Sequence, residues 1–196
     1  MLGIFLDVET SGLDFFKHRI LEIAFKIIDI STGEEKKVYH AIIQQSKKVW
    51  EQRDPASVIF NGFTWDKVLM GKDEQTIAQE IIQLFSELEI VRGKAIYICQ
   101  NPAFDRSFFS QLIDVYTQER LKWPYHWLDL ASMYWVIQVK KIADEHLLFP
   151  ENINLSKNAI AHYYQLPDEP NPHTAMNGVE HLITCYKAVV GFRAKA

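Results

Sequence analysis

The chain has 196 residues, 48% of them hydrophobic and 13% aromatic, which is enough apolar material for one sizeable core. Its 21 basic and 25 acidic residues give a formal net charge of −4, which excludes the broad positive field of a tight nucleic-acid binder but not a short or transient nucleic-acid substrate. The sequence has no membrane-length apolar run, no signal peptide and too few cysteines (Cys99 and Cys185) for a disulfide framework, so we expect a cytoplasmic protein without a membrane anchor.

The first half of the chain predicts three strands, a mixed segment and a helix. Apolar, roughly alternating runs predict strands at residues 2–8, 19–30 and 37–43, with the last two paired as a hairpin. Turn signals break up residues 46–72, where short helical pieces fit between them. Asp73 is placed to cap a helix whose apolar residues recur at helical spacing.

The second half predicts two further strands, each followed by a helix. The strands are expected at residues 94–99 and 127–130, and the first of them should run parallel to the opening strand. The helices are expected from Asn101-Pro102 with an apolar stripe of Phe104, Phe108, Leu112 and Val115, then at 131–139, at 154–165 with Leu155 on its apolar face, and from about Val179 to Val190. The order indicates an α/β fold, a mixed sheet covered by helices, in a single domain spanning residues 1–196.

Asp7 and Glu9 are unusual because they interrupt the apolar first strand. Alternate side chains of a strand share a face, so these carboxylates point the same way, roughly 7 Å apart. Like charges on a half-buried face repel each other and resist desolvation. Something positive should neutralise them, either a Lys or Arg partner or a divalent cation. The plainer alternative is a pair of solvated acids at the end of a surface strand.

Two later polar residues fall where they could join this pair. Asp105 lies in the first turn of the helix that follows a buried strand, and sites in open α/β sheets gather at the carboxyl ends of strands. Its alternative role is an acid that stabilises a helix dipole. His173 lies at a loop-to-helix junction, where it could serve as a base or be an ordinary surface histidine.

Taken together, these stretches resemble the DEDD-type 3′–5′ exonucleases, in the subgroup that uses a histidine base and includes the proofreading epsilon subunit of DNA polymerase III, ribonuclease T and oligoribonuclease. The resemblance rests on FLDVETSGLD at residues 5–14, RILEIA at 19–24, NGFT at 61–64, NPAFD at 101–105, LDL at 128–130 and HTA at 173–175. The ordered set spans nearly the whole chain and is far more specific than any one motif.

The resemblance implies an RNase H-like fold with a five-stranded mixed sheet and two-metal hydrolysis by Mg²⁺ or Mn²⁺. Asp7 would ligate both ions, Glu9 one of them, and Asp105 would help to hold the pair, partly through water. His173 would take the proton from the attacking water, and the products would be nucleoside 5′-monophosphates.

The implied substrate is the 3′ end of single-stranded DNA or RNA, and the sequence does not choose between the two nucleic acids. The residues expected to contact the terminal nucleotide, or to pack beneath it, are Thr10, Leu13, Phe63, Asn101 and Phe104. The short segment after the last helix favours a free-standing nuclease over one tethered to a polymerase, and the family also offers homodimers as an assembly.

The chain departs from the family at the fourth acid, five residues after the histidine, where Gly178 stands. Glu180 should point away around a helix, His181 lies one turn further along, and Asn177 would need a shift in register. Two interpretations follow. The protein is either an exonuclease weakened at one metal position, or a degenerate exonuclease domain that binds nucleic-acid ends or a protein partner.

A function of another class, a metal-dependent phosphatase or a non-catalytic adaptor, is also compatible with an acidic cleft in an α/β protein. The phosphatase alternative lacks the nucleophilic Asp motif with its companion Lys or Thr residues. The adaptor alternative predicts no phosphodiester cleavage with any metal.

Overall fold

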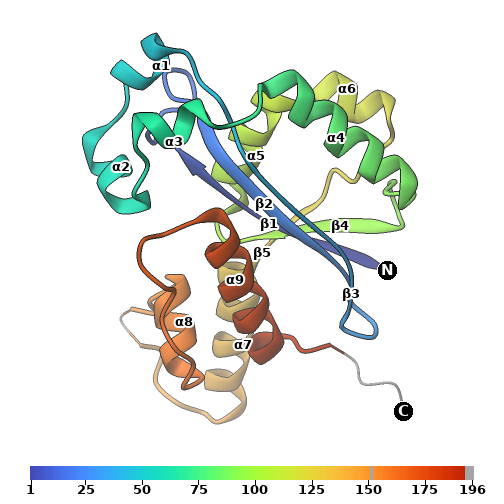
Figure 1. Cartoon of the computed structure of the whole chain (residues 1–196). Helices are drawn as coiled ribbons and strands as arrows, with labels where there is room; N and C mark the ends of the chain where they lie inside the picture. The colour runs from blue at the N-terminus through green and yellow to red at the C-terminus, as the bar shows by residue number, and fades with distance from the viewer. Residues whose placement is uncertain (151, 193–196) are drawn as a thin grey trace.

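The computed structural model describes residues 1–150 and 152–192, which form a five-stranded mixed sheet with helices on both faces (Figure 1). The sheet order is β3-β2-β1-β4-β5, with β1 antiparallel to β2, β2 antiparallel to β3, and β4 parallel to both β1 and β5. The strands are β1 (Leu2–Thr10), β2 (Ile20–Asp29), β3 (Glu34–Ile42), β4 (Ala95–Cys99) and β5 (Trp127–Asp129). The five predicted strands, the hairpin and the parallel pairing are confirmed.

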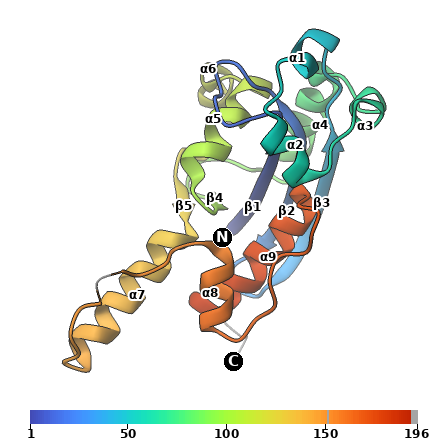
Figure 2. The ribbon, with the colours of Figure 1, turned by 90° about the vertical axis from the view of Figure 1, so that its left-hand side faces the viewer.

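The helices divide into three groups (Figure 1). They are α1 (Lys47–Glu51), α2 (Pro55–Asn61), α3 (Trp65–Leu69), α4 (Glu74–Glu87), α5 (Pro102–Leu112), α6 (Val115–Arg120), α7 (Leu130–Asp144), α8 (Lys157–Tyr163) and α9 (Ala175–Val189). Helices α4, α5 and α6 lie on one side of the sheet, α7, α8 and α9 on the other, and α1 to α3 cluster at one end. In Figure 2, α7 projects away from the sheet, while α9 lies along it. Within the described residues, no helix is both long and apolar enough to cross a membrane.

Local signals explain most helix boundaries. Asp73 accepts a hydrogen bond from the backbone N–H of Thr76 and caps α4, as predicted. The short helical pieces expected before it are α1, α2 and α3. The prediction for the end of α5 was wrong, because Val115 does not continue its apolar stripe. Instead, Asp114 accepts hydrogen bonds from the backbone of the next turn and starts α6 there, leaving Val115 exposed.

The prediction for α8 also needs a correction, because the helix is shorter than residues 154–165. Ser156 accepts a hydrogen bond from the Ala159 N–H and caps the helix, so Leu155 lies before it. The Leu155 carbonyl accepts a hydrogen bond from the side chain of Gln100 at the end of β4. This contact ties the approach to α8 to the edge of the sheet where β1 and β4 end.

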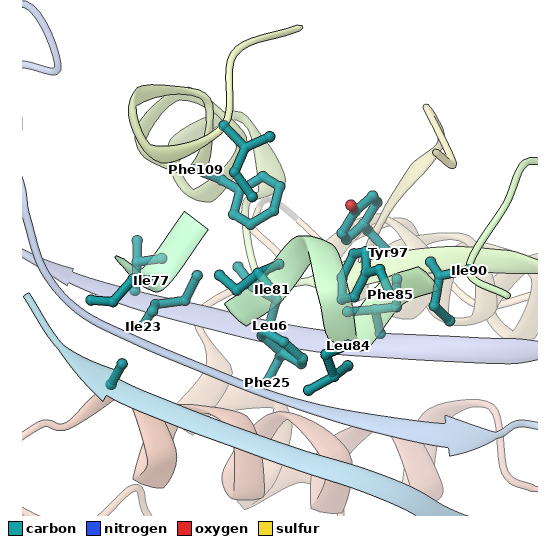
Figure 3. Close-up of a cluster of buried hydrophobic side chains, with 14 of the residues drawn as sticks. Leu6, Ile23, Phe25, Ile77, Ile81, Leu84, Phe85, Ile90, Tyr97 and Phe109 are labelled. Carbon is teal, nitrogen blue, oxygen red and sulfur yellow. The ribbon is translucent and has the colours of Figure 1, made fainter. Parts of the chain in front are cut away.

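The alternation of side chains along β1 divides the molecule into two packed layers. Leu6 faces the cluster beneath α4, where Phe25 of β2 meets Ile81 and Phe85 (Figure 3). Phe5 faces the opposite side and packs with α9, its ring 5.0 Å from that of Tyr186. Because side chains two residues apart share a face, Asp7 and Glu9 continue the row of Phe5 toward the α9 side. The apolar cores therefore fix β1 rigidly and decide which face of the sheet its carboxylates share.

Candidate active site

The two carboxylates of β1 lie at the end of the strand, beside α9 and the loop that precedes it. Asp7 is mostly buried, and Glu9 lies two residues further toward the open edge. The buried side chain of Asn61, the last residue of α2, donates a hydrogen bond to the Thr10 carbonyl and helps to hold the end of the strand. Asp7 and Glu9 line the same cavity, which confirms the shared face that the alternation predicted.

Asp105 approaches from the neighbouring strand. Asn101, after β4, has a left-handed backbone (φ 56°) and turns the chain into α5, so that Asp105 falls in the first turn and is 97% buried against β1. The Asp129 carboxylate at the end of β5 accepts a hydrogen bond from the Asn101 backbone N–H and fixes this turn. The parallel pairing of β4 with β1 thus delivers Asp105 to the same sheet edge as Asp7.

His173, two residues before α9, is held by two contacts of its ring, and the chain that follows it is anchored by a third. Its Nδ1 lies 3.0 Å from Oε1 of Glu169, and its ring stacks on Phe60 of α2 with centroids 3.9 Å apart. Two residues later, the backbone N–H of Ala175 donates to the buried Glu22 carboxylate of β2. These contacts fix the imidazole against the cavity, with the Nδ1 side directed at a carboxylate.

Lys157 supplies the positive group that the carboxylates of β1 need. Its side chain is 12% exposed, and its Nζ lies 2.7 Å from Oε2 of Glu169 and 3.8 Å from Oδ1 of Asp7. The ammonium also donates a hydrogen bond to the Gly178 carbonyl. Of the alternatives that the sequence left open, a Lys partner is therefore present beside Asp7.

Gly178 lies on the face of α9 that meets β1. A Cβ at this position would overlap the Asp7 carboxylate, so the absence of a side chain lets helix and strand approach closely. The neighbours considered as substitutes for the fourth acid do not fill this place. Glu180 forms an ion pair with Lys26, and the Asn177 side chain donates to the Pro172 carbonyl. The buried His181 lies beside Glu169, with Nδ1 3.8 Å from Oε2.

The predicted residues gather around a cavity of about 540 Å³, with one exception. The lining includes Asp7, Glu9, Thr10, Leu13, Asn101, Phe104, Asp105 and His173, together with Phe60, Lys157 and Glu169. The exception, Phe63, was predicted to lie at or beneath a base. It is 96% buried in a separate cluster with Leu21, Trp50 and Val68, because the turn after α2 directs it inward. Phe60, one turn earlier on α2, faces the cavity instead.

Burial and mutual repulsion raise the pKa values of these acids, as expected for carboxylates whose charge is not fully neutralised. Burial, only partly offset by Lys157, raises the pKa of Asp7 to about 7. Burial and the charge of Asp7 raise the pKa of Glu9 to about 8. The pKa of Asp105 is also well above its usual range, chiefly because of burial and Asp7.

Glu169 and Lys157 behave differently because they stabilise each other. Burial alone would raise the pKa of Glu169, but its contacts with His181 and Lys157 lower it to about 2. Burial would lower the pKa of Lys157, yet Asp7 and Glu169 outweigh it and leave that pKa raised. Both groups are therefore charged at neutral pH.

The donor set fits one divalent ion better than a closed two-ion cage. Among residues 1–150 and 152–192, no group of three or more His, Cys, Asp or Glu side chains surrounds a common point. Mg²⁺ often takes only one or two carboxylates and fills its shell with phosphate oxygens and water, and Asp7 and Glu9 meet that need. The place next to them is taken by Lys157, with Gly178 behind it.

Sequence reasoning missed Lys157 and Glu169. Lys157 carried a signal, since it stands three and four residues before the buried Ile160 and Ala161 and so shares their helix face. Glu169 carried none. It lies between Pro167 and Pro170, outside any periodic element, and reaches the site only because the loop before α9 folds back over α8.

A sequence model of the exonuclease family typified by RNase T matches residues 4–186 of this chain. Among curated proteins, no sequence matches significantly.

Several solved exonuclease structures share the fold. Escherichia coli exonuclease I in complex with a dT13 oligonucleotide superposes with a TM-score of 0.74 at 20% identity, covering 98% of this chain and 41% of that one. A zinc-bound complex of E. coli exonuclease I with single-stranded DNA gives 0.71 at 19% identity, covering 96% and 40%. Cell-death related nuclease 4 gives 0.67 at 12% identity, covering 95% and 62%. This chain thus spans about two fifths of the exonuclease I chains, and the expected RNase H-like fold is confirmed.

Proposed function

The chain belongs to the RNase T family of exonucleases, and on that premise we propose that it removes nucleotides from the 3′ ends of single-stranded DNA or RNA as nucleoside 5′-monophosphates. The observation that carries the proposal is the convergence of Asp7, Glu9, Asp105 and His173 on one cavity from β1, α5 and the start of α9. The oligonucleotides bound to exonuclease I support single-stranded ends as the substrate class.

Asp7 and Glu9 are the proposed ligands of a Mg²⁺ or Mn²⁺ ion, with Asp105 supporting them. A divalent ion bound there would neutralise phosphate charge and make bound water more acidic. The geometry supports one such ion, and the second ion that the sequence predicted would compete with Lys157. Zinc in one exonuclease I structure supports divalent ions as cofactors of such sites.

His173 is the proposed base. A neutral imidazole whose Nδ1 donates to the Glu169 carboxylate presents Nε2 as the proton acceptor. Stacking on Phe60 restricts rotation of the ring. Together, Glu169 and Phe60 would hold the base in one orientation without touching the scissile phosphate.

The walls of the cavity suit an unpaired terminal nucleotide. Leu13 is 73% exposed and Phe60 is 58% exposed, so both present apolar surface to a base. Phe104 and the backbone near Thr10 and Asn101 line the rest. Aromatic stacking tolerates any base, so this lining leaves DNA and RNA both open as substrates. The cytoplasmic location and the homodimer stay predictions.

A second candidate is a catalytically silent domain that binds 3′ ends, and the buried Lys157 favours it. An ammonium beside Asp7 offers a phosphate one positive partner without a metal ion. Such a domain would bind single strands in the presence of a chelator and cut nothing.

One experiment separates the two candidates. A 5′-labelled single-stranded oligonucleotide, DNA or RNA, is incubated with the protein in Mg²⁺, in Mn²⁺ and in EDTA, beside Asp7→Asn and His173→Gln. A ladder shortening from the 3′ end that both variants abolish supports the exonuclease. Binding without shortening in either metal supports the silent domain, and neither binding nor shortening contradicts both.

A further inference from the structure

Lys157 is the most unusual charged residue of the cavity because its ammonium is buried among oxygen atoms. Lysine is rarely this buried unless it is paired. Here the partners come from three parts of the chain: Glu169 from the loop before α9, Asp7 from β1 and the Gly178 carbonyl from α9. Two carboxylates and a carbonyl also make up the kind of oxygen surroundings that a hard metal cation takes.

The ammonium and Gly178 fit together as a unit. A side chain at position 178 would overlap the Asp7 carboxylate, so glycine keeps α9 close to β1 while its carbonyl remains open to Lys157. An acid at this position would add a negative charge beside Asp7. The chain instead has no side chain there and provides a positive charge from α8.

The neutralisation by Lys157 is one-sided. Its ion pairs reach Asp7 and Glu169, whereas no ion pair joins Glu9 to a Lys, Arg or His among the described residues. The end of β1 near Glu9 therefore remains open to a cation, and the end near Gly178 does not.

We propose that the Lys157 ammonium permanently replaces one of the two metal ions at this site, so that the protein binds a single divalent ion. This inference rests on the proposed function only in that both use the carboxylates of Asp7 and Glu9. It makes Lys157 the residue that sets the number of ions, and Glu169 the fixed counter-ion that keeps Lys157 in place.

The test counts ions and does not require catalysis. Binding of Mn²⁺ is followed by electron paramagnetic resonance on the full chain without nucleic acid, for the wild type, Lys157→Met and Lys26→Met. Lys26 is the matched control, because it also bridges two carboxylates, Glu35 and Glu180, but lies outside the cavity.

We expect one Mn²⁺ per chain for the wild type and for Lys26→Met. Lys157→Met should bind a second ion, or bind the first at least about tenfold more tightly, because a unit positive charge within about 4 Å of a ligand is gone. In EDTA the melting temperature of Lys157→Met should be lower than that of the wild type. In millimolar Mn²⁺ it should return toward the wild-type value, since the ion then replaces the ammonium.

Two Mn²⁺ ions on the wild type would overturn the proposal, and so would a Lys157→Met variant that binds no more and no tighter. If Lys157→Met does not fold, the same measurement is made on Lys157→Gln, with the same expected result. If neither variant folds, the number of Mn²⁺ ions bound by the wild type decides alone. Failure of the proposed function is seen separately, as an uncut oligonucleotide in Mg²⁺ and Mn²⁺, and leaves the ion count valid.

Discussion

The Nζ atom of Lys157 lies 2.7 Å from Oε2 of Glu169, and the Glu169 side chain is only 5% exposed. A buried ion pair gains little over an apolar pair, but breaking it from one side leaves a charge that has neither water nor partner. The pair should therefore matter most to stability when only one of its members is removed.

Replacing Glu169 by Gln should destabilise the protein by about 3 kcal/mol or more, because Lys157 loses its closest counter-ion while remaining buried. Urea unfolding followed by circular dichroism measures the change. The control is Glu180→Gln, which removes an exposed partner of Lys26 and should cost at most about 1 kcal/mol. Equal losses in the two variants would show that the Lys157–Glu169 pair is no more important than a surface pair.

Gly178→Ala should destabilise the protein by about 1–3 kcal/mol, because the added methyl group overlaps the Asp7 carboxylate. Helix propensity alone predicts the opposite sign, a gain of up to about 1 kcal/mol. Thermal and urea unfolding measure the sign, with Thr184→Ala on the same helix as control, because the Thr184 side chain is half-buried and bonds only to the Glu180 carbonyl of its own helix. For the same reason, Gly178→Asp should not raise nuclease activity while Lys157 is present, and increased cleavage by that variant would contradict this account.

Much of this site could be predicted from sequence because its parts are local. Asp7 and Glu9 follow from the alternation of one strand, and Asp105 from a Pro-started helix after a buried strand. Parallel pairing of β4 with β1 then brings them together. The five strands were readable for the same reason, since each has its own apolar pattern.

The neutralising groups could not be predicted in that way. Glu169 acts through a loop whose path depends on tertiary docking, including the hydrogen bond from its backbone N–H to the Asn158 side chain. The helix face of Lys157 was readable from the buried residues that follow it, but the counter-ion that holds its ammonium beside Asp7 comes from this loop. The sequence predicted a positive group near Asp7 without locating it. It also predicted Phe63 at the cavity, where Phe60 lies instead, because the turn after α2 directs Phe63 into a separate cluster.

In metal-free buffer, Glu9 should make the protein less stable as the pH rises. Burial and Asp7 raise the pKa of Glu9 from 4.5 to about 8, so between these values the folded chain holds a proton that the unfolded chain has released. Stability contributed by this proton is complete below about pH 4.5 and is lost as the pH approaches 8.

Near pH 8, the free energy of unfolding measured in urea should therefore be about 1–2 kcal/mol larger for Glu9→Gln than for the wild type. The difference should vanish near pH 4. Asp7 and His181, whose pKa values are raised to about 7 and about 9, give slopes of the same sign but are present in both proteins. The comparison is made in EDTA, so that no ion neutralises the carboxylates. Parallel stability curves for the two proteins across this range would contradict the prediction.

Phe60 should contribute to binding of the substrate more than its exposed position on α2 suggests. The ring covers one face of His173 and lines the cavity, so its loss both removes a stacking surface and frees the imidazole to rotate. Stacking of a base on an aromatic ring contributes about 1–3 kcal/mol, and Phe60→Ala should therefore weaken binding of a single-stranded oligonucleotide by about tenfold. Fluorescence anisotropy in EDTA measures this without cleavage. Tyr116→Ala is the control, since Tyr116 is 83% exposed on α6 and does not line the cavity. If both variants bind like the wild type, the bases do not stack at Phe60 and the strand enters along another wall.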